Sequence, residues 1–307
     1  RNPGVEKREH VTRGDDYVAH KQLREAIVEY RSAIQLDPRF GEAREKLAET
    51  YVKLGDGAGA YREYIRAADL MPDNIHVQIR AGDALLAAHR FEDAKARADK
   101  ILAKTPTSVD AQILRANALA GLNKLDDAVT QIQTAISAAP DRATTYASLG
   151  AMQLVRGNVT AAQDAFQRAV NQDPKSVQAH LALGNFFWSR AELKRAEEQL
   201  TLAVTLDPLN ETANRALSYF YLGTGRLDEA EKPLKTLAES VPGESHKLEL
   251  ADYYALRQRG GDAIRVLQQV SPDDRDAYAT AQLRLAGNDF VSNPQKAEGM
   301  VDAILKQ

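Results

Sequence analysis

The chain has 307 residues, of which 40 are basic and 43 are acidic, and its formal net charge is −3. This balance argues against a nucleic-acid binder, and no apolar run approaches the roughly 18 residues that span a bilayer. The chain has no cysteine, which excludes disulfides, thiolate zinc sites and cysteine nucleophiles.

Three series of residues recur in phase at an interval of 34 residues. The first series consists of prolines: Pro38, Pro72, Pro106, Pro140, Pro174, Pro208 and Pro242. The second consists of alanines: Ala26, Ala60, Ala94, Ala128, Ala162, Ala196 and Ala230, with Ala263 one residue early. The third consists of small residues: Gly14, Ala48, Gly82, Ala116, Gly150, Gly184 and Ser218, then Ala251. Phased series of this length predict an array of repeated units.

Each period predicts two helices, which in the fifth unit run from Thr144 to Val155 and from Ala161 to Val170. The residue after the first helix should adopt the left-handed conformation that favours glycine and asparagine. Four units place such a residue there, namely Gly55, Asn123, Gly157 and Gly225. Three others place Lys21, His89 and Ala191 there.

The phased prolines should end each second helix, because proline cannot continue the hydrogen-bond ladder. Polar residues that follow within two positions are predicted N-caps of the next helix. They are Asn74, Ser108, Asp141, Ser176 and Asn210. We also expect the phased small residue of the first helix to meet the phased alanine of the second, because close helix contacts require small side chains.

These phased residues resemble the tetratricopeptide repeat. The first unit shows the pattern as Gly14, Tyr17, Ala26, Tyr30, Ala33 and Pro38. The resemblance implies an all-α fold, a right-handed superhelical solenoid of antiparallel helix pairs with about eight to nine repeats.

The repeat register predicts the domain organisation. We expect an N-terminal tail at residues 1–6, seven regular 34-residue units at 7–244 and two divergent units at 245–307. Pro272 comes early and predicts a shortened second helix in the eighth unit, and Gly287 to Gln295 reads as an irregular loop. Val301, Ile304 and Leu305 do not form the polar cap that normally ends a solenoid. We therefore expect a truncated array, with association through its uncapped C-terminal end.

Catalytic motifs are absent from the sequence. The six histidines form no zinc-binding spacing, and the chain lacks a Gly-x-Ser-x-Gly elbow and a glycine-rich phosphate loop. The sequence therefore predicts a protein that is not an enzyme and has no catalytic residue, cofactor or metal.

In tetratricopeptide proteins the first helix of each unit lines a concave groove. The resemblance implies an early acidic strip of Asp15, Glu42, Glu45, Glu49, Asp83 and Asp110. It implies a later, mainly apolar strip, in which we predict the peptide-binding or partner-binding residues Leu154, Val155, Leu181, Asn185, Trp188, Arg215, Tyr219 and Leu222. Trp188, the only tryptophan, would be a typical binding anchor, and the alternative is that it packs as structure. The acidic strip favours a basic peptide, and the alternative is a solvated helix face.

Three functions remain open at this point. The first is a scaffold that binds a peptide or partner protein in the groove. The second is a regulatory or targeting domain of a larger enzyme or of an exopolysaccharide-export assembly, and the third is an architectural element. The opening segment from Arg1 to Lys7 resembles the start of mature bacterial tetratricopeptide lipoproteins, which favours the cell envelope over the cytoplasm.

Overall fold

The computed structural model describes residues 3–290 and 293–305. Arg1 and Asn2, where the lipoprotein-like segment begins, lie outside the described residues, and so do residues 291–292 of the expected loop. The side chain of Leu305, which entered the expectation of an uncapped end, also lies outside them.

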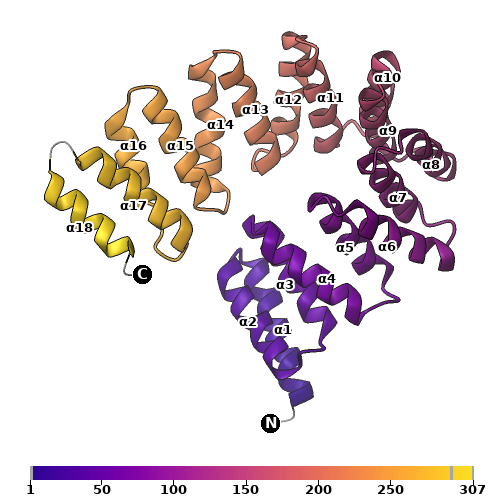
Figure 1. The fold of residues 1–307 in the computed structure, drawn as a ribbon, viewed down its shortest axis with the longest axis horizontal. Coiled ribbons are helices and arrows are strands. Elements are labelled where there is room, and N and C mark those ends of the chain that lie inside the picture. Colours follow the sequence, from indigo (N-terminus) through magenta and orange to yellow (C-terminus); the bar gives the residue numbers. More distant parts are fainter. Residues whose placement is uncertain (1–2, 291–292, 306–307) are drawn as a thin grey trace. The chain divides into compact units, whose positions relative to one another are not determined.

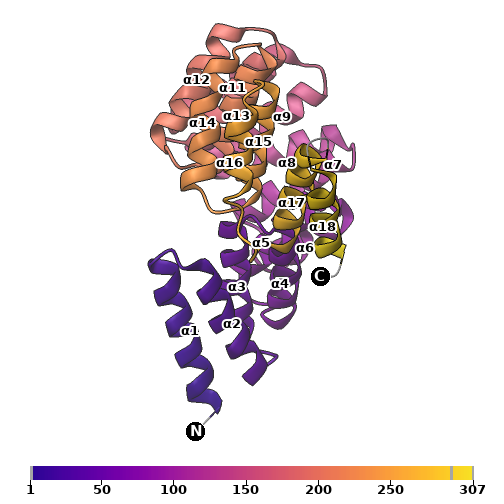
Figure 2. The same cartoon turned by 90° about the vertical axis from the view of Figure 1, so that its left-hand side faces the viewer.

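The chain is helical throughout its described parts, which contain no strand, and it divides into two compact units, residues 1–182 and 183–307 (Figures 1 and 2). The boundary falls inside α11 (Val177–Ser189). The other helices of the first unit are α1 (Pro3–Ala19), α2 (Leu23–Leu36), α3 (Gly41–Leu54), α4 (Gly57–Leu70), α5 (Ile75–Ala87), α6 (Phe91–Lys104), α7 (Val109–Gly121), α8 (Leu125–Ala138), α9 (Ala143–Val155) and α10 (Val159–Gln172). Those of the second unit are α12 (Leu193–Leu206), α13 (Glu211–Gly223), α14 (Leu227–Ser240), α15 (Ser245–Leu256), α16 (Gly260–Leu267), α17 (Arg275–Asp289) and α18 (Pro294–Leu305).

Within each unit the helices pack in chain order as antiparallel pairs, for example α3 with α4 and α13 with α14 (Figure 1). Each pair also packs on the next helix in the chain, as α4 does on α5 and α14 on α15. The predicted all-α architecture of helix pairs is therefore confirmed.

The ends of the array differ in detail from the expectation. Helix α1 begins at Pro3, so residues 3–6, which we expected to form a tail, are helical. The eighth unit has the predicted short second helix, because α16 spans eight residues and α14 spans 14. Helix α17 continues to Asp289, so the start of the expected loop is helical as well.

The left-handed residues lie at the predicted positions. Gly55, Asn123 and Gly157 have φ of 80°, 60° and 80°. The less favourable residues adopt the same conformation, with φ of 61° at Lys21 and 58° at Ala191. The turn between paired helices therefore dictates this backbone angle even where the side chain opposes it.

Four of the five predicted N-caps are confirmed, since the side chains of Asn74, Ser108, Ser176 and Asn210 each accept from the amide three residues on. The prediction for Asp141 was wrong, because the N-cap of α9 is Arg142. Each cap lies two residues after its phased proline, and Asp141 lies one residue after Pro140.

At five of the seven phased prolines, the proline carbonyl accepts a hydrogen bond from the side chain six residues later. The donors differ in chemistry: Arg44 to Pro38 (3.0 Å), Gln112 to Pro106 (3.0 Å), Tyr146 to Pro140 (2.8 Å), His180 to Pro174 (3.0 Å) and Asn214 to Pro208 (2.9 Å). These bonds tie the end of one helix pair to the first helix of the next and give each of the five carbonyls a partner.

The expected contact between the two phased small series needs correction. A Cβ on Gly14 would lie 2.5 Å from the ring of Tyr30, and one on Gly150 would lie 2.7 Å from the ring of Phe166. The small residue therefore makes room for a large side chain of the second helix, four residues beyond the phased alanine. The alanine itself is buried, as at Ala162, which is 0% exposed.

Candidate functional site

The first unit contains three of the predicted binding residues, and they differ in accessibility. Val155 at the end of α9 is 69% exposed, and Leu154 is half-buried. Leu181 on α11 is only 4% exposed, so its side chain belongs to the core and offers no surface to a partner.

The second unit places Trp188 partly inside its own fold. The indole lies edge-on to Phe220 at a centroid distance of 5.6 Å, and a Cβ on Gly223 would lie 3.0 Å from it. Tyr219 on α13 is 48% exposed and Leu222 is half-buried. Trp188 thus has a packing role, and part of its ring remains accessible.

Arg215, a further predicted site residue, is already paired. Its guanidinium donates to Glu211 at 2.8 Å, to Glu249 at 3.2 Å and to the ring of His246 at 3.3 Å. Burial lowers the pKa of Arg215, but Glu249 and Glu211 outweigh that effect and raise it overall. This cluster joins α13 to α15 and leaves the arginine little capacity for a partner.

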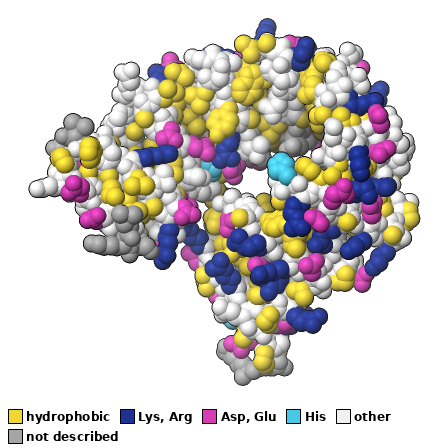
Figure 3. Space-filling model, in the orientation of Figure 1, with side chains coloured by type: hydrophobic (Ala, Val, Ile, Leu, Met, Phe, Trp, Pro, Cys, Tyr) yellow, Lys and Arg dark blue, Asp and Glu magenta, His cyan; other side chains and the backbone are white. Residues whose placement is uncertain are grey.

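Most of the predicted acidic strip is also neutralised within the first unit. Asp15 accepts from Lys46 at 3.0 Å, Glu45 contacts His76 at 2.9 Å, Glu42 lies 4.0 Å from Arg8, and Asp110 pairs with Arg142. Figure 3 shows the same mixture, with Lys and Arg side chains interspersed among Asp and Glu. Glu49 and Asp83 differ, because neither makes an ion pair or hydrogen bond to another described residue.

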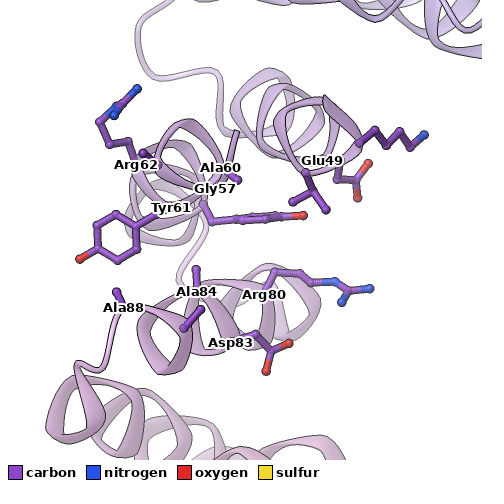
Figure 4. Close-up of a pocket in the computed structure, with 14 residues that line it drawn as sticks. Glu49, Gly57, Ala60, Tyr61, Arg62, Arg80, Asp83, Ala84 and Ala88 are labelled. Carbon is purple, nitrogen blue, oxygen red and sulfur yellow. The ribbon is translucent and has the colours of Figure 1, made fainter. Parts of the chain in front are cut away.

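Glu49 and Asp83 both line a recess of about 970 Å³ between α3, α4 and α5 (Figure 4). Its walls are mainly apolar, with Tyr61 and Tyr64 from α4 and Ala84 from α5. The space exists because the facing helix ends carry few large side chains. The small residues around it are Gly57, Ala58, Ala60, Ala84, Ala87 and Ala88.

Five charged side chains surround this recess. They are Glu49 and Lys53 on α3, Arg62 on α4, and Arg80 and Asp83 on α5. None of the five makes an ion pair or hydrogen bond to any described residue, although such pairs are frequent elsewhere in the first unit. Pairing of Glu49 with Lys53, or of Arg80 with Asp83, within one helix turn would stabilise the chain by only about 0.2–0.5 kcal/mol. A partner would therefore displace such pairs at small cost.

Two groups at the recess have raised pKa values, and desolvation is the main cause in both. Burial raises the pKa of Tyr64 to about 12; Glu49 and Asp83 add to this effect, and Arg80 opposes it. Asp83 keeps much of its surface open to solvent, yet desolvation by the surrounding protein raises its pKa, which Arg80 lowers and Asp110 raises further. Both groups therefore hold a proton more tightly than they would in water.

The sequence did not predict this recess, although it placed Glu49 and Asp83 on the groove face. The available signal was the run of small residues from Gly57 to Ala60, together with Ala84, Ala87 and Ala88 at the end of the next helix. Such residues also promote close helix packing, so their spacing alone does not distinguish an open recess from a tight contact.

The described residues contain neither a metal-binding cluster nor a membrane-spanning helix. Among them, no three His, Asp or Glu side chains gather closely enough to hold a metal ion. None of their helices combines the length and apolar character needed to cross a bilayer.

Family models match much of the chain. A model described as TPR repeat matches residues 14–55, and two described as tetratricopeptide repeat match residues 55–108 and 85–152, and 153–211. No curated protein sequence matches the chain significantly.

Solved structures resemble the chain at low sequence identity. PilW, titled a widely conserved type IV pilus biogenesis factor, is 19% identical with a TM-score of 0.52, and the match covers 69% of this chain and 98% of PilW. MamA from Desulfovibrio magneticus RS-1 is 17% identical with a TM-score of 0.48, over 56% of this chain and 97% of MamA. The APC/C hetero-tetramer Cut9–Hcn1 is 16% identical with a TM-score of 0.49, over 96% of this chain and 55% of that one. At these identities the likeness to PilW shows the fold alone.

Proposed function

Because this chain belongs to the tetratricopeptide repeat family, whose members are generally non-catalytic protein-interaction modules, we propose that it is a scaffold that binds a peptide in the recess between α3, α4 and α5. One observation carries this proposal. The recess combines apolar walls with five charged side chains that have no partner among the described residues. A mostly apolar pocket with a few convergent polar groups is typical of a binding site.

The volume of the recess suits a few side chains of a partner. About 970 Å³ lies at the upper end of the range of roughly 300–1,000 Å³ that is usual for ligand pockets. An extended peptide or one face of a helix would place its anchor between Tyr61 and Ala84 and expose the remainder of its chain to the rim.

A second contact surface, on the second unit, follows from the sequence prediction. It consists of Asn185, Trp188, Tyr219 and Leu222, with Trp188 supported from below by Phe220. Aromatic side chains that are partly buried and partly accessible are frequent anchors in interfaces. Trp188 also provides a local fluorescent reporter for this surface.

Selection of a random 12-residue peptide phage library on the intact chain tests the proposed function. We expect selected peptides to lose binding to Ala84→Phe, whose ring would occupy the recess. They should still bind Ala161→Phe, which adds the same ring at an exposed position of α10. Failure to select any peptide, or equal binding to both variants, would refute a peptide site in the recess.

The fluorescence emission of Trp188 shows at which of the two surfaces a selected peptide binds. A peptide that shifts this emission and binds Ala84→Phe normally uses the second unit. A peptide that is lost with Ala84→Phe and leaves the emission unchanged uses the recess.

A further inference from the structure

The recess has a distinct chemical character at each end. In Figure 4, Glu49, Arg80 and Asp83 lie toward one end, and Tyr61 and Arg62 lie toward the other. At the second end the hydroxyl of Tyr61 accepts from Arg90 at 2.8 Å, and Arg90 in turn pairs with Asp93. Asp93 balances Arg90, so Arg62 is the unpaired cation toward that end, whereas the first end carries the two carboxylates together with Arg80.

Glu49 and Asp83 come from different helices and approach the recess from α3 and α5. Of the four other acidic residues of the predicted strip, three pair with a lysine or arginine and Glu45 contacts the ring of His76, as described above. The two carboxylates that make no ion pair therefore lie toward the same end of the apolar recess, and Arg80 is the cation beside them. A cation placed there would interact with both carboxylates in surroundings that are partly desolvated, where charge pairing is stronger than on an open surface.

Resting on the proposed function, we propose that the recess selects peptides in which a large apolar side chain stands next to a lysine or arginine. The apolar side chain would lie against Tyr61, Tyr64 and Ala84. The neighbouring cation would lie between Glu49 and Asp83.

Arg80 competes with the incoming cation for Asp83, so its removal should strengthen binding. Arg80 lies one helix turn before Asp83 and lowers its pKa through space, without making an ion pair among the described residues. A partner that used an anionic group instead would gain from Arg80 and lose affinity when it is removed. The sign of this single change therefore distinguishes a cationic from an anionic partner.

The same 12-residue phage library, selected on the wild-type chain, provides the test. We expect the peptides to be enriched in Leu, Met or aromatic residues adjacent to Lys or Arg. The preferred peptide, made synthetically and titrated by fluorescence anisotropy at 50 mM NaCl, should bind the Glu49→Gln, Asp83→Asn double variant at least about tenfold more weakly. It should bind Arg80→Ala more tightly than wild type.

A Glu9→Gln, Glu42→Gln double variant is the matched control. It makes the same change in net charge within the first unit at two exposed residues that do not line the recess. Its affinity should stay within about twofold of wild type. Circular dichroism of each variant excludes unfolding as the cause of a loss.

Three results would overturn the inference. They are selected peptides without enrichment in Lys or Arg, equal losses in the two double variants, and weaker binding by Arg80→Ala. If peptides are selected and lost with Ala84→Phe but show no preference for a cation, the proposed peptide site stands and only the cation rule fails.

Discussion

The surfaces around α3–α5 and around α13–α15 use the same repeat geometry but treat charge in opposite ways. In the first, Arg80 and Asp83 lie beside an open recess and have no ion pair among the described residues. In the second, Arg215 is held by Glu211, Glu249 and His246. The phased residues that build the helix pairs are common to both surfaces. The two surfaces therefore differ in the residues between these phased positions.

The largest expected effect on stability concerns Trp188, whose side chain packs within the second unit. Trp188→Ala should lower the free energy of unfolding by about 3 kcal/mol, because the indole fills the space beside Phe220 and Gly223. Tyr219→Ala, on the neighbouring exposed position, should change it by less than about 0.5 kcal/mol. Urea unfolding followed by circular dichroism measures both. Equal effects would mean that Trp188 is a surface residue like Tyr219.

The second prediction concerns the phased alanines, which are buried in both units. Ala162→Leu in the first unit and Ala230→Leu in the second should each cost about 2 kcal/mol, because both alanines are 0% exposed and the contact cannot absorb the added volume. Ala161→Leu, on the exposed side of α10, is the control. Thermal unfolding reports the loss. A variant at either buried position that is as stable as the parent contradicts the assignment of a common interior.

Removal of one arginine from each surface sharpens the contrast in charge. Arg215→Ala should destabilise the chain by about 1 kcal/mol, because Glu211 and Glu249 lose their partner in a partly buried cluster. Arg80→Ala should change stability by less than about 0.5 kcal/mol, since this side chain makes no ion pair or hydrogen bond to a described residue. Chemical denaturation at low salt tests the pair. If Arg80→Ala destabilises the chain as much as Arg215→Ala does, the two surfaces do not differ in this way.

The smallest effect is a pH dependence of opposite sign on the two surfaces. Lys235 and Arg259 lower the pKa of Glu231 in the second unit, so Glu231 stabilises the fold above its unfolded pKa, and this contribution is lost as the pH falls through the folded value. Desolvation raises the pKa of Asp83, so its ionisation destabilises the fold at neutral pH.

Comparison of two isosteric variants measures this difference. Glu231→Gln should be less stable than wild type at pH 7, and Asp83→Asn more stable, each by a few tenths of a kcal/mol. Both differences should shrink below about pH 4, where the carboxyl groups become protonated. Melting temperatures recorded from pH 3 to pH 8 provide the readout. Shifts of the same sign would show that Asp83 is stabilised like Glu231.

The framework was predictable from sequence because its rules are local. Phased prolines, alanines and small residues have a fixed spacing. A left-handed residue such as Gly157 can be predicted from its position directly after a helix. The N-cap at Arg142 was missed because the choice between adjacent residues depends on the exact end of a turn.

The site was less predictable because it depends on pairings between helices. The sequence marked Glu45 and Glu49 as equivalent groove residues, and only the structure shows that His76 pairs with the first while the second remains unpaired. In the same way, the register placed Leu181 on the groove face, and packing within the fold buries it.

The side chains that satisfy the phased proline carbonyls have a consequence for protein engineering. Five residue types occupy this position: arginine, glutamine, tyrosine, histidine and asparagine. The position therefore requires a hydrogen-bond donor but not a particular residue type. A designed library of interchangeable units could therefore vary this position freely among donors. Leucine or phenylalanine at one of these five junctions would leave the proline carbonyl without its side-chain donor, although the chain itself has Leu248 six residues after Pro242.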